Sequence, residues 1–362
     1  MTEFHSQELS EEQGRRRAIK CVVWDLDNTL WDGILLEDAV VGLRGEVIDI
    51  IKTLDARGIL HCIASRNDFE KSMEKLEEFR LREFFLCPQI NWNSKVSSIK
   101  TIAGSIGIAL DAIAFVDDDP FERAEMNFSC PEVLCIDAAN LSCMLGMPEM
   151  TPEVISSDAK IRRLRYLKNI TREKAEAEFT GPHEDFLATL GMVFSIAPAG
   201  ERDLERAEEL TVRTHQLNST GYTYSFDQLN RFRQSDRHQL LITSLRDKFG
   251  SYGKIGLALI ECEQTVWTLK LLLMSCRVVS RGVGTILLNH IMEQASKQNV
   301  ILRAEFVPTD RNRMMYITYK FAGFKEQERH GDCLILENDL SRRQLSPAYI
   351  KVRYCSAPLE SG

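Results

Sequence analysis

The feature that most constrains the fold is a regular alternation of short apolar runs with amphipathic stretches, which begins at residue 19. Residues 19–25 read IKCVVWD, residues 44–58 read RGEVIDIIKTLDARG, and residues 59–65 read ILHCIAS. Short runs rich in Val and Ile are typical of buried strands, whereas the longer charged stretches have the spacing of helices. The order is therefore strand, helix, strand, helix.

The same alternation continues to about residue 138. A charged amphipathic stretch covers residues 68–79, and the apolar run FFLCPQI follows at residues 84–90. A helix is predicted from about Ser94 to Ile106, with Ser94 as its N-cap, and another from about Pro120. The runs AIAFVDDD and VLCID supply the remaining strands. Crossover connections of this kind predict a parallel sheet.

The second half of the chain has a different pattern. Residues 151–184 are strongly charged and helical in spacing, which is typical of a connection between domains. Three strand-like runs follow between residues 238 and 278, and their short turns predict a mainly antiparallel meander. The glycine-bearing turn SRGVGT then opens an amphipathic helix. We therefore expect a mixed α/β domain, and 362 residues suffice for two domains of ordinary size.

Composition excludes several classes of protein. The chain has a net charge of −8, which argues against wrapping nucleic acid. It has no apolar run long enough to cross a membrane, and its start is polar, so we expect a cytoplasmic location. Its ten cysteines form no CxxC pair, and we expect reduced thiols and no zinc site.

Acidic and polar side chains follow four of the predicted strands in the first half. Asp25 and Asp27 follow the first strand, Ser65 follows the second, Lys95 begins the next helix, and Asp117 with Asp118 ends the fourth strand. The carboxyl ends of parallel strands meet at one edge of a sheet, where ligands bind. There a carboxylate can attack phosphorus, a second can transfer a proton, and a lysine can stabilise the transition state. Carboxylates also suit Mg²⁺.

These residues resemble the four motifs of the haloacid dehalogenase (HAD) superfamily: DxDxT, a serine after the second strand, a lysine, and a pair of aspartates. The resemblance covers residues 19 to about 138. It implies that Asp25 is the nucleophile or the phosphate-facing metal ligand. It further implies that Asp27 lends its backbone carbonyl to the metal and its side chain to proton transfer. The implied metal ligands are Asp25, Asp27 and Asp117, and the implied phosphate-binding residues are Ser65, Arg66, Asn67, Lys95 and Asp118.

A closer resemblance covers residues 19 to about 340. The segments DLDNTLWDG, IASRND, FVDDDPFERAEM, RTHQLNSTG, DKFGSYGKIG and SCRVVSRGVG are similar to the FkbH-like family. In that family a HAD half is fused to a half similar to GCN5-type acyltransferases. The resemblance implies that the chain takes 1,3-bisphosphoglycerate, forms a glyceryl thioester, and loads glyceryl onto an acyl carrier protein. The implied cofactor is Mg²⁺, with no nucleic-acid or membrane partner.

The predicted fold class is therefore a HAD-type, Rossmann-like parallel sheet domain followed by a mixed α/β domain similar to GCN5-type acyltransferases. We expect a polar extension over residues 1–18, the phosphate and magnesium domain over 19–150, and a linker helix over 151–184. The acyltransferase-like domain should cover 185–340, followed by a tail over 341–362.

Cys276 is the candidate for the thiol that holds the glyceryl group. Arg277 is adjacent and Arg281 is near in sequence, and neighbouring cations lower the pKa of a thiol. The alternative is a buried structural thiol at the end of an apolar strand. GCN5-type acyltransferases usually have Arg or Gln three residues before the first glycine of this turn, but Val279 stands at that distance before Gly282. This difference weakens the case for binding of coenzyme A. Binding of the phosphopantetheine arm of a carrier protein stays possible.

Other candidates in the second half have equally ordinary alternatives. His215 and Asn218 follow an amphipathic helix, where they can orient a thioester or act on the cysteine proton, or simply end the helix. Asp247 and Phe249 are expected in a loop that faces the same cleft, although turn formation alone explains the glycines around them. The basic stretch at residues 160–168 is a candidate contact for an acidic carrier protein.

The sequence is therefore compatible with three functions. In the preferred one, a thiolate attacks the acyl phosphate and the 3-phosphate is removed at Asp25; a variant binds the acyl phosphate at the same site without an aspartyl-phosphate. The second is a magnesium-dependent phosphatase of a small metabolite, with the other half as a lid. The third is a noncatalytic protein that docks a carrier protein.

Overall fold

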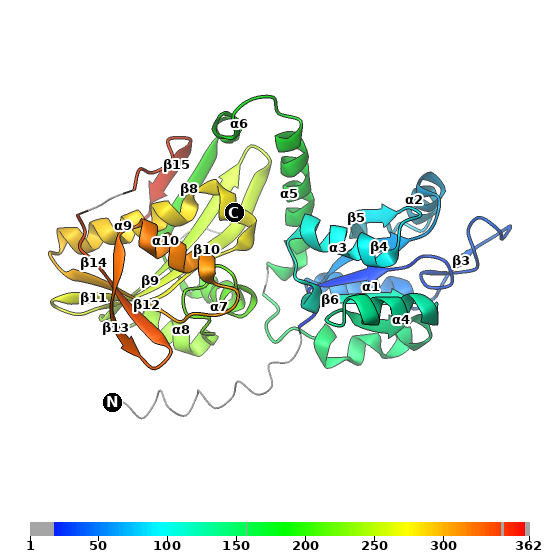
Figure 1. The fold of residues 1–362 in the computed structure, drawn as a ribbon, viewed down its shortest axis with the longest axis horizontal. Helices are drawn as coiled ribbons and strands as arrows, with labels where there is room; N and C mark the ends of the chain where they lie inside the picture. Colours follow the sequence, from blue (N-terminus) through cyan, green and yellow to red (C-terminus); the bar gives the residue numbers. More distant parts are fainter. Residues whose placement is uncertain (1–17, 157, 342–343, 359–362) are drawn as a thin grey trace. The chain divides into compact units, whose positions relative to one another are not determined.

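The computed structural model describes residues 18–156, 158–341 and 344–358, and the chain divides into two compact units (Figure 1). Unit 1 comprises residues 1–155 and 159–166, and unit 2 comprises residues 156–158 and 167–362. The predicted polar extension at 1–18 lies almost wholly outside the described residues. Among the described residues, no helix has both the length and the apolar character needed to cross a membrane.

Unit 1 contains a five-stranded parallel sheet in the order β5-β4-β1-β6-β7. Its strands are β1 (Cys21–Trp24), β4 (Leu60–Ser65), β5 (Phe85–Ile90), β6 (Ile113–Asp117) and β7 (Leu134–Asp137). The helices that connect them are α1 (Val47–Ala56), α2 (Phe69–Glu78), α3 (Lys95–Ile106) and α4 (Pro120–Ser129). A short hairpin of β2 (Trp31–Asp32) and β3 (Gly42–Leu43) follows β1.

Local sequence explains where these helices begin. The side chain of Ser94 accepts a hydrogen bond from the Ser97 amide, so Ser94 is the N-cap that the sequence predicted. Asp68 caps α2 in the same way, and Asp119 caps α4 with Pro120 as its first residue. One face of the central strands packs against α1 and α2, and this core includes the fully buried Trp24. The parallel α/β architecture predicted for this half is confirmed.

Unit 2 is built on an eight-stranded mixed sheet in the order β13-β14-β12-β11-β10-β9-β8-β15. The strands are β8 (Met192–Pro198), β9 (His238–Asp247), β10 (Gly250–Cys262), β11 (Val266–Met274), β12 (Ile301–Phe306), β13 (Phe324–His330), β14 (Cys333–Asn338) and β15 (Ile350–Tyr354). Strands β9 to β11 form the expected antiparallel meander, β8 extends it by pairing antiparallel with β9, and β12 pairs with β11 in parallel.

Helices cover both faces of this sheet. Their bounds are α5 (Arg162–Ala177), α6 (His183–Thr189), α7 (Leu204–Arg213), α8 (Phe226–Arg233), α9 (Val283–Lys297) and α10 (Arg313–Phe321). Buried residues of α6, α9 and α10 form one core with the sheet, and those of α7 and α8 form a second core on the other face. The predicted mixed α/β class of this half is confirmed.

Two features of the predicted domain map differ from the structure. Residues 341–362 were expected as a tail, yet residues 350–354 form β15, which pairs in parallel with β8 at the edge of the sheet. Residues 151–184 were expected as one linker helix, whereas the structure contains α5 and the start of α6 there. Residues 162–166 of α5 belong to unit 1 and residues 167–177 to unit 2.

Candidate active site

The parallel sheet of unit 1 brings the predicted phosphate-handling residues to one edge. Trp24 pairs with Ile63 of β4 and with Val116 of β6, so the residues that follow these positions leave the sheet at the same level. Asp25 and Asp117 are therefore neighbours, although 91 positions separate them in the numbering. Both are nearly inaccessible to solvent, with exposed fractions of 5% and 0%. The register of the sheet explains the convergence.

Lys95 lies between these two carboxylates. Its Nζ atom is 2.5 Å from Oδ2 of Asp117 and 3.1 Å from Oδ1 of Asp25, and its side chain is itself buried. The ammonium also lies 5.9 Å from the centre of the Phe115 ring. A buried lysine is stable only when paired, and here it is shared by two acids. The two carboxylates therefore hold the ammonium group of Lys95 beside Asp25, at the edge of the sheet where the sequence predicted it.

The buried setting raises the pKa of the two carboxyl groups, Asp25 and Asp117. Burial raises the pKa of Asp25 to about 7; Lys95 opposes this shift, and Asp117 adds to it. The hydroxyl of Ser65 hydrogen-bonds Asp25 and also opposes the shift. Burial likewise raises the pKa of Asp117. For Lys95, burial works to lower the pKa, but the two carboxylates raise it above its usual value. The site thus carries more negative charge than its lysine balances.

Three carboxylates in this site can hold a metal ion. One oxygen from each of Asp25, Asp117 and Asp118 lies within 4.8 Å of the other two. Such a set of hard oxygen donors fits Mg²⁺, and a divalent cation would balance the excess negative charge. Asp118, which the sequence placed among phosphate-binding residues, therefore stands with the candidate metal ligands.

The side chain of Asp27 has hydrogen-bond partners of its own. Its Oδ1 accepts hydrogen bonds from Nε1 of Trp31 at 2.8 Å and from the Leu35 amide at 3.1 Å, and its Oδ2 accepts from the Asn67 amide group at 2.9 Å. The Asp27 carboxylate is not among the three clustered carboxylates, and the resemblance assigned the metal to its backbone carbonyl, not to its side chain. Its orientation leaves proton transfer as the expected role of its side chain.

Thr29 and Asn28 contribute to the site in ways that sequence reasoning missed. The Thr29 hydroxyl is buried, accepts a hydrogen bond from the Asp118 amide at 3.0 Å and lies 3.3 Å from Oδ1 of the same residue. Asn28 has a positive φ of 53°, a conformation that Asn tolerates better than most residues, and its side chain accepts from the Gly33 amide. The motif DLDNT therefore supplies structural support as well as acids.

Arg66 and Asn67 follow Ser65 and point in different directions. The Asn67 side chain is buried and binds Asp27, so it orients the carboxylate expected to move protons. The Arg66 side chain is partly exposed, and its Nη1 atom lies 2.8 Å from Oε1 of Glu122. Glu122 was not among the predicted site residues, and its only sequence signal was its place three residues into the helix that follows the aspartates.

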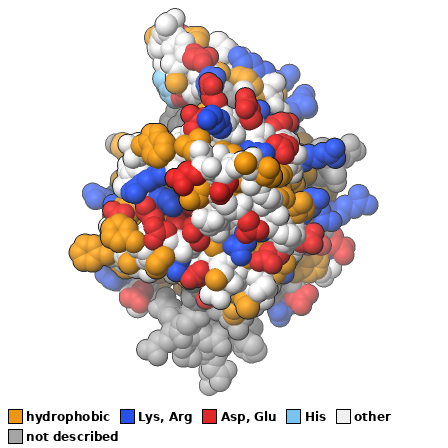
Figure 2. Space-filling model, turned by 90° about the vertical axis from the view of Figure 1, so that its right-hand side faces the viewer, with side chains coloured by type: hydrophobic (Ala, Val, Ile, Leu, Met, Phe, Trp, Pro, Cys, Tyr) orange, Lys and Arg blue, Asp and Glu red, His pale blue; other side chains and the backbone are white. Residues whose placement is uncertain are grey.

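Large apolar side chains also stand exposed at this edge of unit 1. Phe69, Trp92 and Phe121 belong to the segments that follow β4, β5 and β6, and their exposed fractions are 49%, 70% and 69%. Figure 2 views the molecule from this side and shows apolar side chains scattered among acidic and basic groups. The surroundings of the site are therefore mixed in character, not uniformly charged.

Cys276 in unit 2 is exposed and begins the short 3-10 helix at Cys276–Arg281. Its exposure removes the alternative of a buried structural thiol. The two cations expected beside it have other partners: Arg277 donates to the Ser275 hydroxyl at 3.2 Å, and Arg281 donates to Glu176 at 3.1 Å. The effect of these two cations on the Cys276 thiol therefore stays a prediction.

The segment at residues 217–220 is built into the sheet of unit 2. Strands β11 and β12 pair only as far as Leu269 and Ala304. Beyond that point Ser219 bridges them, because its amide donates to Leu272 of β11 and its carbonyl accepts from the Val307 amide after β12. The predicted cleft residue Asn218 lies in this bridge.

The side chain of Asn218 is occupied within its own loop. It is fully buried, and its Oδ1 accepts hydrogen bonds from the amides of Thr220 and Gly221 at 3.1 and 2.9 Å. Its amide group donates to the Thr214 carbonyl at 3.3 Å. Asn218 thus holds the bridge in shape and does not line an open cleft. His215 lies partly buried at the start of the same loop, two residues after α7.

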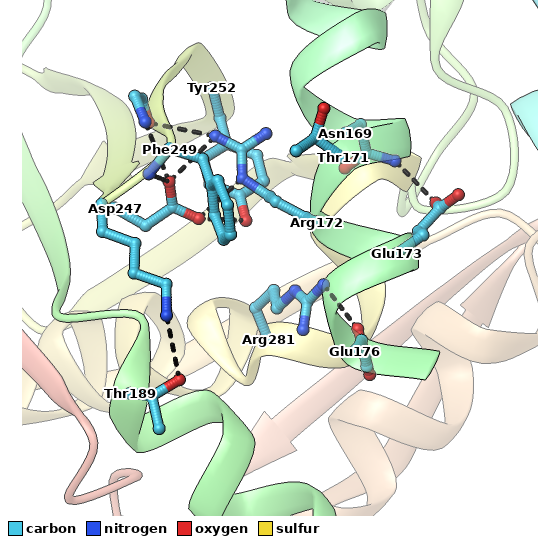
Figure 3. A network of polar contacts seen from close by, with 12 residues as sticks. Asn169, Thr171, Arg172, Glu173, Glu176, Thr189, Asp247, Phe249, Tyr252 and Arg281 are labelled. Atoms are coloured by element: carbon cyan, nitrogen blue, oxygen red, sulfur yellow. Dashed lines mark hydrogen bonds and ion pairs between the residues drawn. The ribbon is translucent and has the colours of Figure 1, made fainter. Parts of the chain in front are cut away.

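Asp247 and Phe249 also have a structural setting, shown in Figure 3. Asp247 accepts two hydrogen bonds from Arg172 of α5, at 2.6 and 3.0 Å, and one from the Tyr252 hydroxyl at 3.0 Å. The guanidinium of Arg172 lies 3.8 Å from the centre of the Tyr252 ring and 6.0 Å from that of Phe249. The expected cleft-facing loop is in fact the anchor of α5 on unit 2.

Two arginines of the basic stretch at residues 160–168 are bound to groups of unit 1. Arg162 donates to the Gly58 carbonyl at 2.6 Å and is largely buried. Arg163 pairs with Asp55 at 3.0 Å and lies over the Phe84 ring. These two cations stabilise α5 against unit 1, which reduces the positive surface that the stretch can offer to an acidic partner.

Comparisons with known proteins found one related protein by sequence and several solved structures that match part of the chain. No family model matches the chain. The human protein magnesium-dependent phosphatase 1 is 29% identical over 143 residues, which cover 34% of this chain and 80% of that protein. The chain is similar to it in sequence over that region. This likeness is in keeping with the resemblance to HAD proteins that the motifs of residues 19–138 suggest.

Two of the solved structures each match about two fifths of the chain. The N-terminal part of BF1531 from Bacteroides fragilis, which contains a phosphatase domain complexed with Mg, is 27% identical, with a TM-score of 0.29, and the match covers 42% of this chain and 40% of that one. The ribosomal-protein-S18-alanine N-acetyltransferase of Escherichia coli is 18% identical, with a TM-score of 0.33, over 41% of this chain and 95% of that one.

Proposed function

We propose that unit 1 is a magnesium-dependent phosphohydrolase and that the whole chain is a glyceryl transferase/phosphatase that serves an acyl carrier protein. The observation that carries the first part is the buried set of Asp25, Lys95, Asp117 and Asp118 at the edge of the parallel sheet. The second part rests on the resemblance to the FkbH-like family and on an exposed thiol in unit 2.

The residues of unit 1 supply each requirement of phosphoryl transfer. Asp25 would attack phosphorus or face the phosphoryl group, and Lys95 would stabilise the charge that develops on the phosphoryl oxygens. Asp27, oriented by Trp31 and Asn67, would carry the proton of the leaving or attacking oxygen. Mg²⁺ bound by Asp25, Asp117 and Asp118 would reduce the repulsion between the carboxylates and an anionic substrate.

In the proposed reaction, the thiolate of Cys276 attacks the acyl carbon of 1,3-bisphosphoglycerate. The bond between that carbon and the phosphate oxygen breaks, inorganic phosphate leaves, and a thioester forms on the enzyme. Water then cleaves the 3-phosphate ester at Asp25, which releases a second phosphate. The thiol of the carrier protein takes the glyceryl group and returns Cys276 to its free form.

A plain phosphatase is the second candidate, and one observation favours it. The acyl-transfer hypothesis placed Asn218 at the thioester, but its side chain is hydrogen-bonded within the loop that bridges β11 and β12. In this alternative, unit 1 hydrolyses a small phosphorylated metabolite and Cys276 has no chemical role. The noncatalytic docking hypothesis is less favoured, because the acids and the lysine of the motifs are all present and Lys95 contacts both Asp25 and Asp117.

Intact mass spectrometry separates these functions. The protein is incubated with Mg²⁺ and 1,3-bisphosphoglycerate, alongside Cys276→Ala and Asp25→Asn. A glyceryl-sized adduct on the wild type that Cys276→Ala abolishes would support acyl transfer. Phosphate release that depends on Asp25, without any adduct, would reduce the protein to a phosphatase. If the protein neither releases phosphate nor forms an adduct, with or without Mg²⁺, only the docking function would remain.

A further inference from the structure

The sheet of unit 2 separates between two neighbouring parallel strands. β11 and β12 pair only as far as Leu269 and Ala304, whereas the two strands continue to Met274 and Phe306. Strands that separate leave backbone N–H and C=O groups that an extended chain can pair with, as a peptide does when it adds to the edge of a sheet. The gap between β11 and β12 is therefore the place in this sheet where an extended ligand would pair.

A pantetheine arm is the candidate ligand for such a gap. The sequence leaves this arm as a ligand of unit 2, and the proposed function requires its thiol. The arm is an extended chain with amide groups, so it can form hydrogen bonds of the kind that join neighbouring strands. Whether it fits depends on what the gap already contains.

Residues 217–219 occupy the gap on the side of β11. The Met274 amide donates to the Leu217 carbonyl at 2.9 Å, and the Ser219 amide donates to the Leu272 carbonyl at 3.0 Å. The Leu272 amide donates to the Ser219 hydroxyl, also at 3.0 Å. These backbone groups of β11 are therefore already paired within the chain.

The same segment closes the gap on the side of β12. The Val307 amide, directly after β12, donates to the Ser219 carbonyl at 3.0 Å. The buried side chain of Asn312 donates to the carbonyls of Asn218 and Val307 at 3.1 and 2.8 Å, which ties the segment to the end of this strand. Asn218 and Ser219 are both fully buried. The segment is thus part of the interior of unit 2 and not a surface loop over an open gap.

We infer that residues 217–219 take the place of an extended ligand between β11 and β12, so that unit 2 does not hold a pantetheine arm within its sheet. Only the identity of the arm rests on the proposed function, and the closed gap is independent of acyl transfer. Entry of the arm would break the hydrogen bonds of Ser219 to both strands, which are costly to lose in the interior. An arm that brings its thiol to Cys276 must therefore approach from outside the gap.

The first test measures hydrogen exchange of the ligand-free, full-length protein by mass spectrometry. A closed gap predicts slow exchange of the amides of Leu272, Met274 and Val307, and fast exchange of these amides would overturn the inference. Ser219→Ala should speed exchange at Leu272 about 10-fold, because it removes one hydrogen-bond acceptor from the interior. Ser195→Ala is the matched control, because Ser195 lies on β8, away from the gap, and it should leave that rate unchanged. An equal effect of both variants would also count against a specific role of Ser219.

The second test titrates the wild type with pantetheine, with coenzyme A, and with adenosine 3′,5′-bisphosphate, which lacks the arm. Holo and apo forms of an acyl carrier protein make the same comparison for an arm carried by a protein. Calorimetry should show no binding of pantetheine tighter than about 1 mM. An arm that binds without changing exchange at residues 217–219 lies outside the gap, as inferred. Binding that speeds exchange at these residues, and that requires the arm, would show that the arm displaces the segment and would overturn the inference.

The closed gap and the proposed function fail in different ways. If the arm enters the gap, exchange at residues 217–219 rises whether or not a glyceryl adduct forms on Cys276. If no adduct forms while exchange at the gap stays slow, the acyl-transfer function is wrong and the gap is still closed.

Discussion

His61 should make unit 1 sensitive to acid, and replacing it with glutamine should remove that sensitivity. The imidazole is fully buried in β4. Its Nδ1 lies 3.1 Å from Nε1 of Trp24, which can only donate, and its Nε2 lies 3.1 Å from the Ile51 carbonyl, which can only accept. These partners assign a neutral ring with its proton on Nε2. A second proton would face the N–H of Trp24 in an apolar core.

The magnitude follows from the shift in pKa. Burial lowers the pKa of His61 from 6.5 to about 3, whereas the unfolded chain keeps the ordinary value. Between these values the unfolded state binds a proton that the folded state does not, so stability falls as the pH falls through that window. At pH 5 the part of this change that His61 contributes is a loss of about 2 kcal/mol relative to pH 8, and it approaches about 5 kcal/mol below pH 3, whereas Asp25, with its raised pKa, contributes in the opposite direction.

The assay is urea unfolding at pH 8 and pH 5, followed by pulsed hydrogen exchange and mass spectrometry. Peptides that cover β1 and β4 report on unit 1 alone. His61→Gln keeps a donor and an acceptor but cannot titrate here, so the change in its free energy of unfolding from pH 8 to pH 5 should be more favourable than that of the wild type by about 2 kcal/mol. Equal losses in the two proteins would refute the reasoning, because the acid sensitivity would then arise from other groups.

Three further outcomes are expected. Thr29→Val should weaken Mg²⁺ binding about 10-fold or more, measured by calorimetry, because it removes the hydroxyl that orients Asp118; unchanged affinity would show that Thr29 does not orient a metal ligand. Arg172→Met should lower the free energy of unfolding of unit 2 by about 3–5 kcal/mol in urea, since it leaves the buried Asp247 unpaired, and adding Asp247→Leu should restore part of it; no recovery would contradict that cause. Excess Mg²⁺ should raise the melting temperature of the wild type but not of Asp117→Ala, and an equal rise in both would place the ion elsewhere.

The acidic edge of unit 1 was predictable because the sequence pattern determines where parallel strands end. Once residues 19–137 were assigned as alternating strands and helices, Asp25, Ser65 and Asp117 had to leave the sheet on the same side. Ser94 was recognisable as an N-cap because the cap is formed within four residues. Such features depend on local chemistry and on the handedness of crossover connections, and both can be derived from sequence.

The partners of individual side chains were not predictable in the same way. Nothing in the sequence indicated that the guanidinium of Arg281 would bond Glu176 on α5. Asn218 was expected in a cleft, but its loop closes the gap where β11 and β12 separate. In both cases the outcome depends on a segment distant in sequence. The same holds for β15, whose pairing with β8 joins the end of the chain to the first strand of unit 2.

The charge in unit 1 also determines the order in which ligands can bind. When Asp25, Asp117 and Asp118 are ionised beside Lys95, three carboxylates and one ammonium leave two negative charges in a buried site. A phosphate dianion brought to this site alone would be repelled, so a divalent cation must bind first or together with it. Phosphate should therefore bind measurably in calorimetry only when Mg²⁺ is present. Tight binding of phosphate without the metal would mean that the acids enter protonated, and that the raised pKa of Asp25, not a metal, neutralises the site.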